Sequence, residues 1–570
     1  MNRRHAFSSL VALFSAPLCL GCAGPLLLFG ADKEVAELEQ ELDIELIGDV
    51  THPYGMNYVR IEDVGLVVGL GGTGGDPPPS PQRSVLIGEM KRREVDEPGK
   101  VLASPNTAMV LVGGYLRPGA QKGDRFDVEV KVPSRDSTTS LRGGKLLPAR
   151  LSELAAVGQQ IHSGHVVAYA EGPVLVDPSA TPEDEALATN GRILGGGVVQ
   201  NGRSLGLVIH DRYASIRLSQ LVGTAINRRF HTIYKGEKQG VANPKKDTFI
   251  ELRVHPRYRE NISRYMQVIR SIAVEETASE LQDRLNLLEN QFSEPLTMQA
   301  AALRLEAIGT KDAIEVLKRA AATQRVPAGD ARFYAAEALA YLDQTEAVEP
   351  LAAVIREEPH RRVQALAALS AMNDRNAYDA LRTLLNEQSA ETRYGAFRAL
   401  WAMNKSDPLV KGEDMGGNFT LHFVASSGPA MVHATNSLRP EIVLFGGPHK
   451  LRLPATLDAG QHILVNGTSG RDITVSRFAP GLPVQQRVVE PDLEQVIRAI
   501  VDLGGTYPDV VQMLQEARDA DVLSSWFRVN AIPDVGRPED RESPVTVDEP
   551  RETSAVRRFA TSWPSLFGDK

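Results

Sequence analysis

The sequence predicts a mixed α+β protein in which an array of paired helices separates two strand-rich regions. Short β-branched runs bounded by glycine, proline and aspartate occur on both sides, and such runs are typical of strands. Between them, residues 297–403 are rich in alanine and leucine at helical spacing. A chain of 570 residues exceeds the size at which one hydrophobic core keeps growing, so several domains are expected.

The chain begins with a pattern typical of an export signal. Arg3 and Arg4 supply a charged start, and residues 6–20 supply a short apolar stretch. This stretch is shorter than the roughly 20 apolar residues that a membrane-spanning helix needs. Residues 1–31 are therefore predicted to direct the chain out of the cytoplasm.

Three fates of this segment remain open. Residues 18–22 approximate a lipoprotein cleavage box, in which Cys22 becomes the lipidated first residue, although Cys19 stands where leucine is usual. Ordinary cleavage beside Gly21 is the second fate, and retention as an anchor, extended by residues 25–29, is the third. Because Cys19 and Cys22 are the only cysteines, an internal disulfide is not expected in the mature chain.

The first strand-rich part opens with predicted strands at residues 65–68, 109–112 and 126–132. The proline-rich residues 76–81 exclude a helix or a central strand, because proline lacks the backbone donor and fixes φ. A helix is predicted over residues 84–91. Further strands are predicted at residues 146–151, 166–176, 205–210 and 248–254, with a helix at 214–230.

Two glycine-containing motifs carry a family resemblance. Residues 64–74 read VGLVVGLGGTG and residues 137–147 read STTSLRGGKLL, with the stretches 106–112 and 119–128 between them in the expected order. Together they resemble the flagellar P-ring protein family over residues 54–274. Residues 431–529, which end in a predicted helix pair, resemble the family more weakly, and the helical part between is foreign to it.

The resemblance implies a structural subunit of the flagellar basal body, located in the periplasm and acting without a cofactor. It implies ring assembly with identical subunits around the rod, with L-ring proteins and peptidoglycan as neighbours. A closed ring needs two different complementary surfaces on each subunit. We expect one of them to include Ser140, Leu141, Arg142, Gly143, Gly144 and Lys145, since the glycines allow close backbone approach. The alternative is a turn that only shapes the fold.

The helical part contains a repeat. Leu339, Leu369 and Leu400 occupy equivalent places in three similar fragments, at spacings of 30 and 31 residues. A second helix recurs at residues 312–317, 347–351 and 377–381. Paired helices at such a period resemble short HEAT repeats, whose stacked units bury a continuous core.

Such an array often presents a face to a protein partner. Six arginines suggest a partly basic face, namely Arg361, Arg362, Arg375, Arg382, Arg393 and Arg398. The favoured interpretation is that they solvate helices and pair with nearby glutamates. If they bind a partner, the alternative function is an envelope-anchored lipoprotein scaffold without a flagellar role.

After a linker at residues 405–418, strands are predicted at residues 421–425, 430–433, 441–445, 450–453, 462–465 and 472–478. From residue 530 onward, charged residues and proline dominate without apolar periodicity, which predicts a largely disordered tail. The predicted parts are residues 1–31 (export signal), 50–275 (P-ring-like α+β region), 276–404 (HEAT-like repeats), 419–529 (β-rich region with the helix pair) and 530–570 (tail).

The sequence offers no basis for an enzyme. Residues 69–74 formally satisfy a dinucleotide-binding glycine pattern, but a proline run follows where a helix N-terminus is required. His162 and His165 lack a neighbouring third metal ligand in the sequence. The net charge of -9 argues against a general nucleic-acid surface, which needs clustered Lys and Arg. No cofactor and no metal are therefore predicted.

Overall fold

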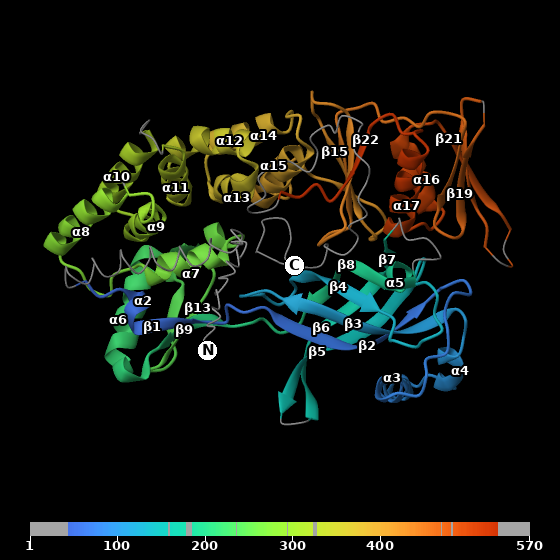
Figure 1. The fold of residues 1–570 in the computed structure, drawn as a ribbon, viewed down its shortest axis with the longest axis horizontal. Coiled ribbons are helices and arrows are strands. Elements are labelled where there is room, and N and C mark those ends of the chain that lie inside the picture. Colours follow the sequence, from blue (N-terminus) through green and yellow to red (C-terminus); the bar gives the residue numbers. More distant parts are fainter. Residues whose placement is uncertain are drawn as a thin grey trace, which may run out of the picture.

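The computed structural model describes most of the chain from residue 44 to residue 533. The described residues are 44–157, 160–177, 185–234, 236–292, 294–322, 328–468, 470–479, 481 and 483–533. The predicted export signal with Cys22, and the predicted tail from residue 534 onward, lie outside them. Figure 1 shows two strand-rich blocks connected by a helical region that runs along one side of the molecule. The predicted mixed α+β class with a helix-rich centre is confirmed.

The larger sheet of the first strand-rich region is antiparallel and has the order β4-β3-β2-β5-β6-β8-β7. β4 also pairs with β8, so six of the strands close on themselves and leave no free edge there. Gly114 and Gly197 make room for the Phe126 ring, which lies 2.7 and 2.4 Å from the Cβ positions that they lack. The strands are β2 (Val59–Val68), β3 (Thr107–Leu116), β4 (Arg125–Lys131), β5 (Lys145–Val157), β6 (Gln160–Pro173), β7 (Leu175–Val176) and β8 (Asn190–Val199).

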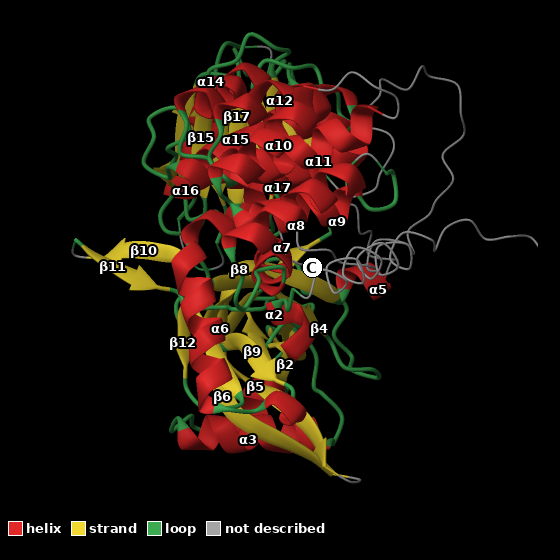
Figure 2. Cartoon of the chain, turned by 90° about the vertical axis from the view of Figure 1, so that its left-hand side faces the viewer, coloured by secondary structure: helices red, strands yellow, loops and turns green. Residues whose placement is uncertain are grey.

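A smaller sheet of the same region has the order β1-β9-β13-β12 and packs against helices α6 and α7. Serine and asparagine caps start these helices: Ser215 accepts the backbone N–H of Leu218, and Asn261 accepts that of Arg264. A two-stranded hairpin, β10–β11, projects beside α6 (Figure 2). The elements of this part are α2 (Ile47–Val50), β1 (Thr51–Tyr54), β9 (Leu205–Ile209), α6 (Ile216–Arg229), β10 (His231–Tyr234), β11 (Glu237–Gly240), β12 (Ala242–Pro244), β13 (Phe249–Leu252) and α7 (Ile262–Arg270). Three further helices of the region belong with the larger sheet, namely α3 (Pro81–Arg92), α4 (Pro98–Leu102) and α5 (Glu185–Ala188).

The helical region consists of helices stacked in two layers (Figure 1). Alternate helices contact one another, α11 with α13, α13 with α15, and α12 with α14. The three leucines of the predicted repeat lie at equivalent depth, with Leu339, Leu369 and Leu400 at most 1% exposed. That these pairs are HEAT repeats stays a prediction. The helices are α8 (Ala278–Gln291), α9 (Met298–Ile308), α10 (Lys311–Ala322), α11 (Ala328–Tyr341), α12 (Val348–Glu357), α13 (Arg362–Ala371), α14 (Arg375–Leu384) and α15 (Ala390–Met403).

Most of the arginines singled out in this region have partners inside the chain. Arg362 and Arg398 are buried and form ion pairs with Glu391 and Glu441, and Arg393 is buried and donates to the carbonyl oxygen of Pro429. The more exposed Arg361 and Arg375 pair with acidic residues, the latter with Asp379. The favoured interpretation, intramolecular pairing, therefore describes these side chains better than a basic binding face does.

The second strand-rich region places helices α16 and α17 between two sheets, β14-β15-β17-β16-β22 and β18-β19-β20-β21 (Figure 1). Both sheets and both helices contribute to one apolar core. The elements are β14 (Glu413–Asp414), β15 (Thr420–Val424), β16 (Met431–Ala434), β17 (Glu441–Phe445), β18 (Ala455–Ala459), β19 (Ile463–Gly467), β20 (Ile473–Arg477), β21 (Gln485–Val489), α16 (Leu493–Asp502), α17 (Tyr507–Asp519) and β22 (Trp526–Val529).

One predicted strand of this region is wrong. Residues 450–453 form no ladder, and only Lys450 and Leu451 make isolated bridges, with Asp492 and Leu523. Pro448 and Pro454 flank the segment, and a residue without a backbone donor cannot extend a ladder. Four strands of this region were not predicted, namely β14, which lies in the expected linker, and β18, β21 and β22. β18 alternates buried and exposed residues, whereas β21 is exposed along most of its length.

A buried carboxylate joins the first strand-rich region to the helical region. Glu306 of α9 is 0% exposed and accepts from Arg264 of α7 at 2.5 Å and from the Tyr258 hydroxyl at 2.6 Å. Arg264 also pairs with Glu337 of α11 at 2.7 Å. Burial raises the pKa of Glu306 above its ordinary value, and the Arg264 guanidinium opposes that rise.

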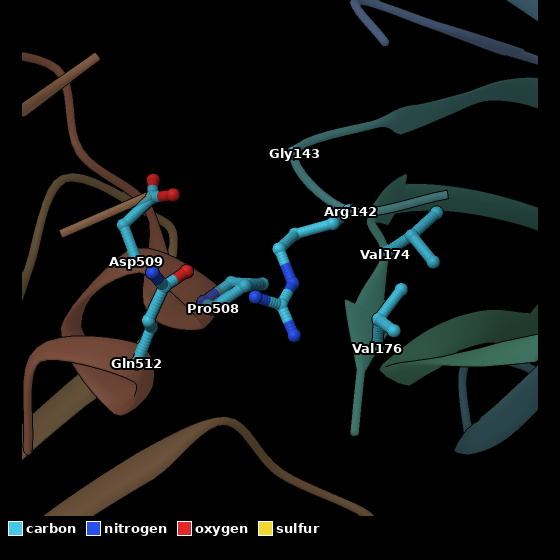
Figure 3. Close-up of a pocket in the computed structure, with 7 residues that line it drawn as sticks. All are labelled: Arg142, Gly143, Val174, Val176, Pro508, Asp509 and Gln512. Carbon is cyan, nitrogen blue, oxygen red and sulfur yellow. The ribbon is translucent and has the colours of Figure 1, made fainter. Parts of the chain in front are cut away.

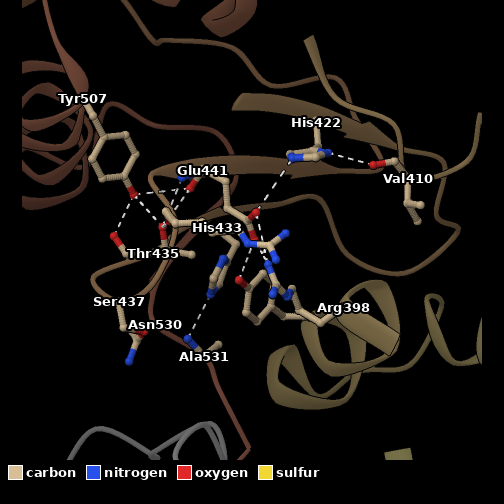
Figure 4. Close-up of polar contacts among 12 residues, drawn as sticks. Arg398, Val410, His422, His433, Thr435, Ser437, Glu441, Tyr507, Asn530 and Ala531 are labelled. Atoms are coloured by element: carbon tan, nitrogen blue, oxygen red, sulfur yellow. Dashed lines mark hydrogen bonds and ion pairs between the residues drawn. The ribbon is translucent and has the colours of Figure 1, made fainter. Parts of the chain in front are cut away.

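A second buried carboxylate joins the helical region to the second strand-rich region (Figure 4). Glu441 of β17 accepts from the Tyr394 hydroxyl at 2.6 Å and from Arg398 of α15 at 3.2 Å. Burial acts to raise the pKa of Glu441, but Arg398 and the other groups around it, including the Tyr394 hydroxyl, outweigh burial and hold the pKa below its ordinary value. Beside it, burial lowers the pKa of His433 to about 3, and its Nε2 accepts the backbone N–H of Ala531.

Replacing Arg264 by methionine tests the first junction. Glu306 and Glu337 would keep their burial and lose their cation, so the free energy of unfolding at pH 8 should fall by about 3–5 kcal/mol. Without Arg264 the folded-state pKa of Glu306 rises further above its unfolded value, so the folded state binds the proton more tightly. The deficit should therefore shrink as the pH falls to 5.

Chemical denaturation at both pH values, followed by circular dichroism, measures this change. The matched control is Arg319→Met, which removes an exposed pair with Glu289 and should cost less than about 1 kcal/mol. Equal losses in the two variants, or a deficit at pH 5 as large as that at pH 8, would contradict the assigned role of Arg264.

Candidate functional site

The two glycine-containing motifs lie against each other in the folded chain. Thr73 donates its hydroxyl to the carbonyl oxygen of Ser140 at 2.8 Å, and the N–H of Thr139 donates to the carbonyl oxygen of Thr73 at 2.9 Å. A Cβ at Gly75 would lie 2.1 Å from the Ser137 hydroxyl oxygen. The motifs therefore form one packed unit in which glycine is needed for backbone approach.

The six predicted contact residues differ in what they expose. Leu141 is 0% exposed and belongs to the core of the closed sheet, and Gly144 is buried where a Cβ would lie 2.4 Å from Val67. Gly143 has φ 75°, a left-handed conformation, and is exposed like Lys145. Ser140 and Arg142 are half-buried, and the Ser140 hydroxyl accepts the N–H of Arg142 at 3.1 Å.

Part of this loop packs against the second strand-rich region of the same chain. Gln461, between β18 and β19, donates its side-chain amide to the carbonyl oxygen of Arg142 at 3.0 Å. Figure 3 shows Arg142 and Gly143 facing Pro508, Asp509 and Gln512 of α17. The hollow between them has a volume of about 10 Å³, which is space for about one water molecule. This side of the loop is a packing contact and has no room for a larger ligand.

Asp509 belongs to the same contact. It caps α17 together with Thr506, whose backbone N–H donates to the carboxylate at 2.7 Å. Burial raises the pKa of Asp509, and the bonds from Thr506 counteract that rise. Its partners are thus those of a helix cap.

A clamp that sequence reasoning missed lies nearby. Asp127 of β4 accepts the N–H of Gly195 at 2.9 Å and the N–H of Leu438 at 2.7 Å. Leu438 lies in the β16–β17 turn, 311 residues away in the sequence. Aspartate is disfavoured in strands, so an aspartate between Phe126 and Val128 is the one sequence signal that pointed to this position. Its charge joins the two strand-rich regions directly.

The described residues contain one serine–histidine pair. His449 Nδ1 lies 2.7 Å from the Ser525 hydroxyl, and its Nε2 lies 3.2 Å from the carbonyl oxygen of Gly446. An open groove of about 420 Å³ runs past His449, but Ser525 is 9% exposed and does not line it. The pair therefore holds β22 against the loop after β17, since a nucleophile must face its substrate.

The structure places no metal-binding group at His162 or His165 within its described part. Among the residues that the structure describes, no group of three or more His, Cys, Asp or Glu side chains is arranged to hold a metal ion. His165 lies on β6 and is exposed, and the side chain of His162 lies outside the described part. No helix in the described ranges has both the length and the apolar character needed to cross a membrane.

As far as the described residues go, the glycine motifs and their surroundings define a site of close packing contacts. Such contacts are those of a structural protein, and the comparison with known families agrees with that class. Residues 46–282 match the model of the flagellar P-ring protein family. The family recognised from the sequence is thereby confirmed for this part of the chain, and both glycine motifs lie within it.

Curated relatives give the same result. The chain is 29% identical over 246 residues to the flagellar P-ring protein of Rhizobium etli, covering 40% of this chain and 59% of that protein. It is 28% identical over 240 residues to that of Caulobacter vibrioides (40% and 58%), and 28% identical over 234 residues to that of Nitratidesulfovibrio vulgaris (40% and 61%). The chain thus spans about three-fifths of these relatives. The family model ends at residue 282, so the weaker resemblance over residues 431–529 stays a prediction.

Gly143→Ala tests whether the left-handed turn is required. An L side chain at φ 75° should cost about 1–2 kcal/mol of stability, and its Cβ would also lie 3.2 Å from Gln461 Cδ. Gly88→Ala is the control, because Gly88 lies inside α3 with nothing within 4 Å of the added Cβ. It should gain up to about 1 kcal/mol. Thermal unfolding compares the two, and a neutral or stabilising Gly143→Ala would refute the requirement.

Proposed function

We propose that this chain is a P-ring-type structural subunit that assembles with copies of itself into a periplasmic ring around the flagellar rod. The observation that carries the proposal is the family match over residues 46–282, within which the two recognised motifs pack against each other. L-ring proteins and peptidoglycan are the further neighbours that the family suggests. In this role the protein bears load and catalyses no reaction.

A rigid subunit suits such a bushing. The buried junctions at Glu306 and Glu441, with the Asp127 clamp, tie the three regions of the chain together. Ring closure further requires a heterologous contact between neighbouring copies. Of the predicted contact residues, Gly143 and Lys145 are the exposed ones, so we propose that they form the accessible part of that contact.

The alternative function, an anchored scaffold that captures a partner through the helical region, has less support. The inner helices of the helical region already pack against other parts of the chain. Helix α9 contacts α7, and α15 contacts the sheet that carries Glu441. The arginines that would have formed a basic face pair mostly within the chain. The helical region is better explained as a brace between the two strand-rich regions.

Electron microscopy of the purified protein without its export signal tests ring formation. We expect closed rings whose dimensions match a density in basal bodies isolated from the source, and loss of that density in a deletion strain. Monodisperse single particles, together with unchanged basal bodies in the deletion strain, would refute the proposed function.

Lys145→Glu tests the proposed contact separately. The side chain is exposed, so the reversal of charge should leave the fold intact and reduce the fraction of oligomer seen by analytical ultracentrifugation. Lys91→Glu, an exposed lysine on α3, is the matched control and should assemble normally. If both variants assemble like the parent protein, Lys145 lies outside the subunit contact.

A further inference from the structure

Cationic side chains from the helical region and the second strand-rich region lie on one indole, and Arg259 of the first strand-rich region adds a charge that acts on one of them, Lys405. Arg439 lies in the β16–β17 turn, Lys405 follows α15, and Arg259 follows the short turn before α7. The Arg439 guanidinium carbon lies 3.5 Å from the centre of the Trp401 ring, and Lys405 Nζ lies 4.6 Å from it. Such distances are those of cation–π contacts. We call Arg259, Lys405, Arg439 and Trp401 the junction cluster.

The cluster has an excess of positive charge. Burial, followed by the charges of Arg439 and Arg259, lowers the pKa of Lys405. Burial, followed by the nearby charge of Arg398, lowers the pKa of Arg439 to about 10. Like charges held together and partly desolvated are stabilised by a bound anion.

Within the described ranges, no carboxylate forms an ion pair with Arg259, Lys405 or Arg439. Arg398 differs, since it already pairs with Glu441. Two acidic charges lie nearby. Glu260 raises the pKa of Lys405 less than Arg439 and Arg259 lower it, and Glu441 raises the pKa of Arg439 less than burial and Arg398 lower it. Within the described ranges, the positive charges of the cluster therefore remain able to bind a further carboxylate.

Arg439 is held in place for recognition of a carboxylate. Its guanidinium uses one face on Trp401, which leaves the N–H groups along its edge free to donate in a bidentate fork. Two hydrogen bonds anchor the β16–β17 turn that carries Arg439. The N–H of Leu438 donates to the Asp127 carboxylate, and the Ser437 hydroxyl donates to the Asn530 side chain at 3.0 Å. Little ordering entropy is then lost when a ligand binds.

We propose that the junction cluster binds an acidic peptide segment, and that residues 534–552 of this chain supply it. The described chain reaches residue 533 directly after Asn530, which is bonded to the turn that carries Arg439. Residues 534–552 contain seven acidic and three basic residues, a net charge of -4. Asp534 follows Asn530 by four residues, and four extended residues span about 13 Å. The first carboxylate of the segment can therefore reach the cluster.

The fluorescence of Trp401 reports whether its ring is covered, provided that Trp401 is the only tryptophan. The parent for the test is the full chain with Trp526→Phe and Trp563→Phe, which leaves Trp401 alone among the three tryptophans. Acrylamide, a neutral quencher, is titrated against this parent and against a full chain whose seven acidic residues in 534–552 are changed to Asn or Gln. We expect an about two-fold higher quenching constant in the neutralised chain, because the ring loses its cover.

Arg439→Glu in the parent should raise the quenching constant in the same way, and high salt should bring the parent to the level of both variants. Arg382→Glu on α14 is the matched control and should leave quenching unchanged. If Arg439→Glu does not fold, the exposed pair Arg259→Glu and Lys405→Glu replaces it.

Two results would overturn the proposal. Equal quenching in the parent and in the neutralised chain would show that residues 534–552 do not cover Trp401. Protection that grows with protein concentration would assign the acidic segment to a second copy and not to the same chain.

Discussion

Glu306 and Glu441 are the two carboxylates on which the arrangement of the molecule depends. Each is buried at an end of the helical region, and each accepts from an arginine and a tyrosine across a junction. A buried carboxylate without its cation is strongly destabilising, whereas the intact pair contributes little net energy over apolar packing. The junctions therefore act mainly by selecting one relative placement of the regions.

Two direct contacts complete this frame. Asp127 bonds across to Leu438, and Gln461 bonds across to Arg142, so the two strand-rich regions touch as well as being bridged by helices. The family motifs lie at this seam. One side of the loop at Ser140–Lys145 packs against the second strand-rich region of the same chain. The exposed backbone of Gly143 and the Lys145 side chain remain accessible to another molecule.

Local patterns were enough for many elements. The helices expected at residues 312–317, 347–351 and 377–381 overlap α10, α12 and α14, because alanine and leucine at helical spacing specify both helix and buried face. Residues 450–453 look like a strand by composition, yet flanking prolines prevent a ladder. β21 lacks an apolar face and left no periodic signal.

The sequence by itself determined the fold class, the helix-rich centre and the family of residues 46–282, because periodicity and glycine motifs are properties of neighbouring residues. Only the tertiary structure decided which charges are buried and which meet. Glu306, Asp127 and the cations around Trp401 have partners tens to hundreds of residues away. No local pattern encodes such pairs, since burial and distance, and not spacing, set the energy of a charge.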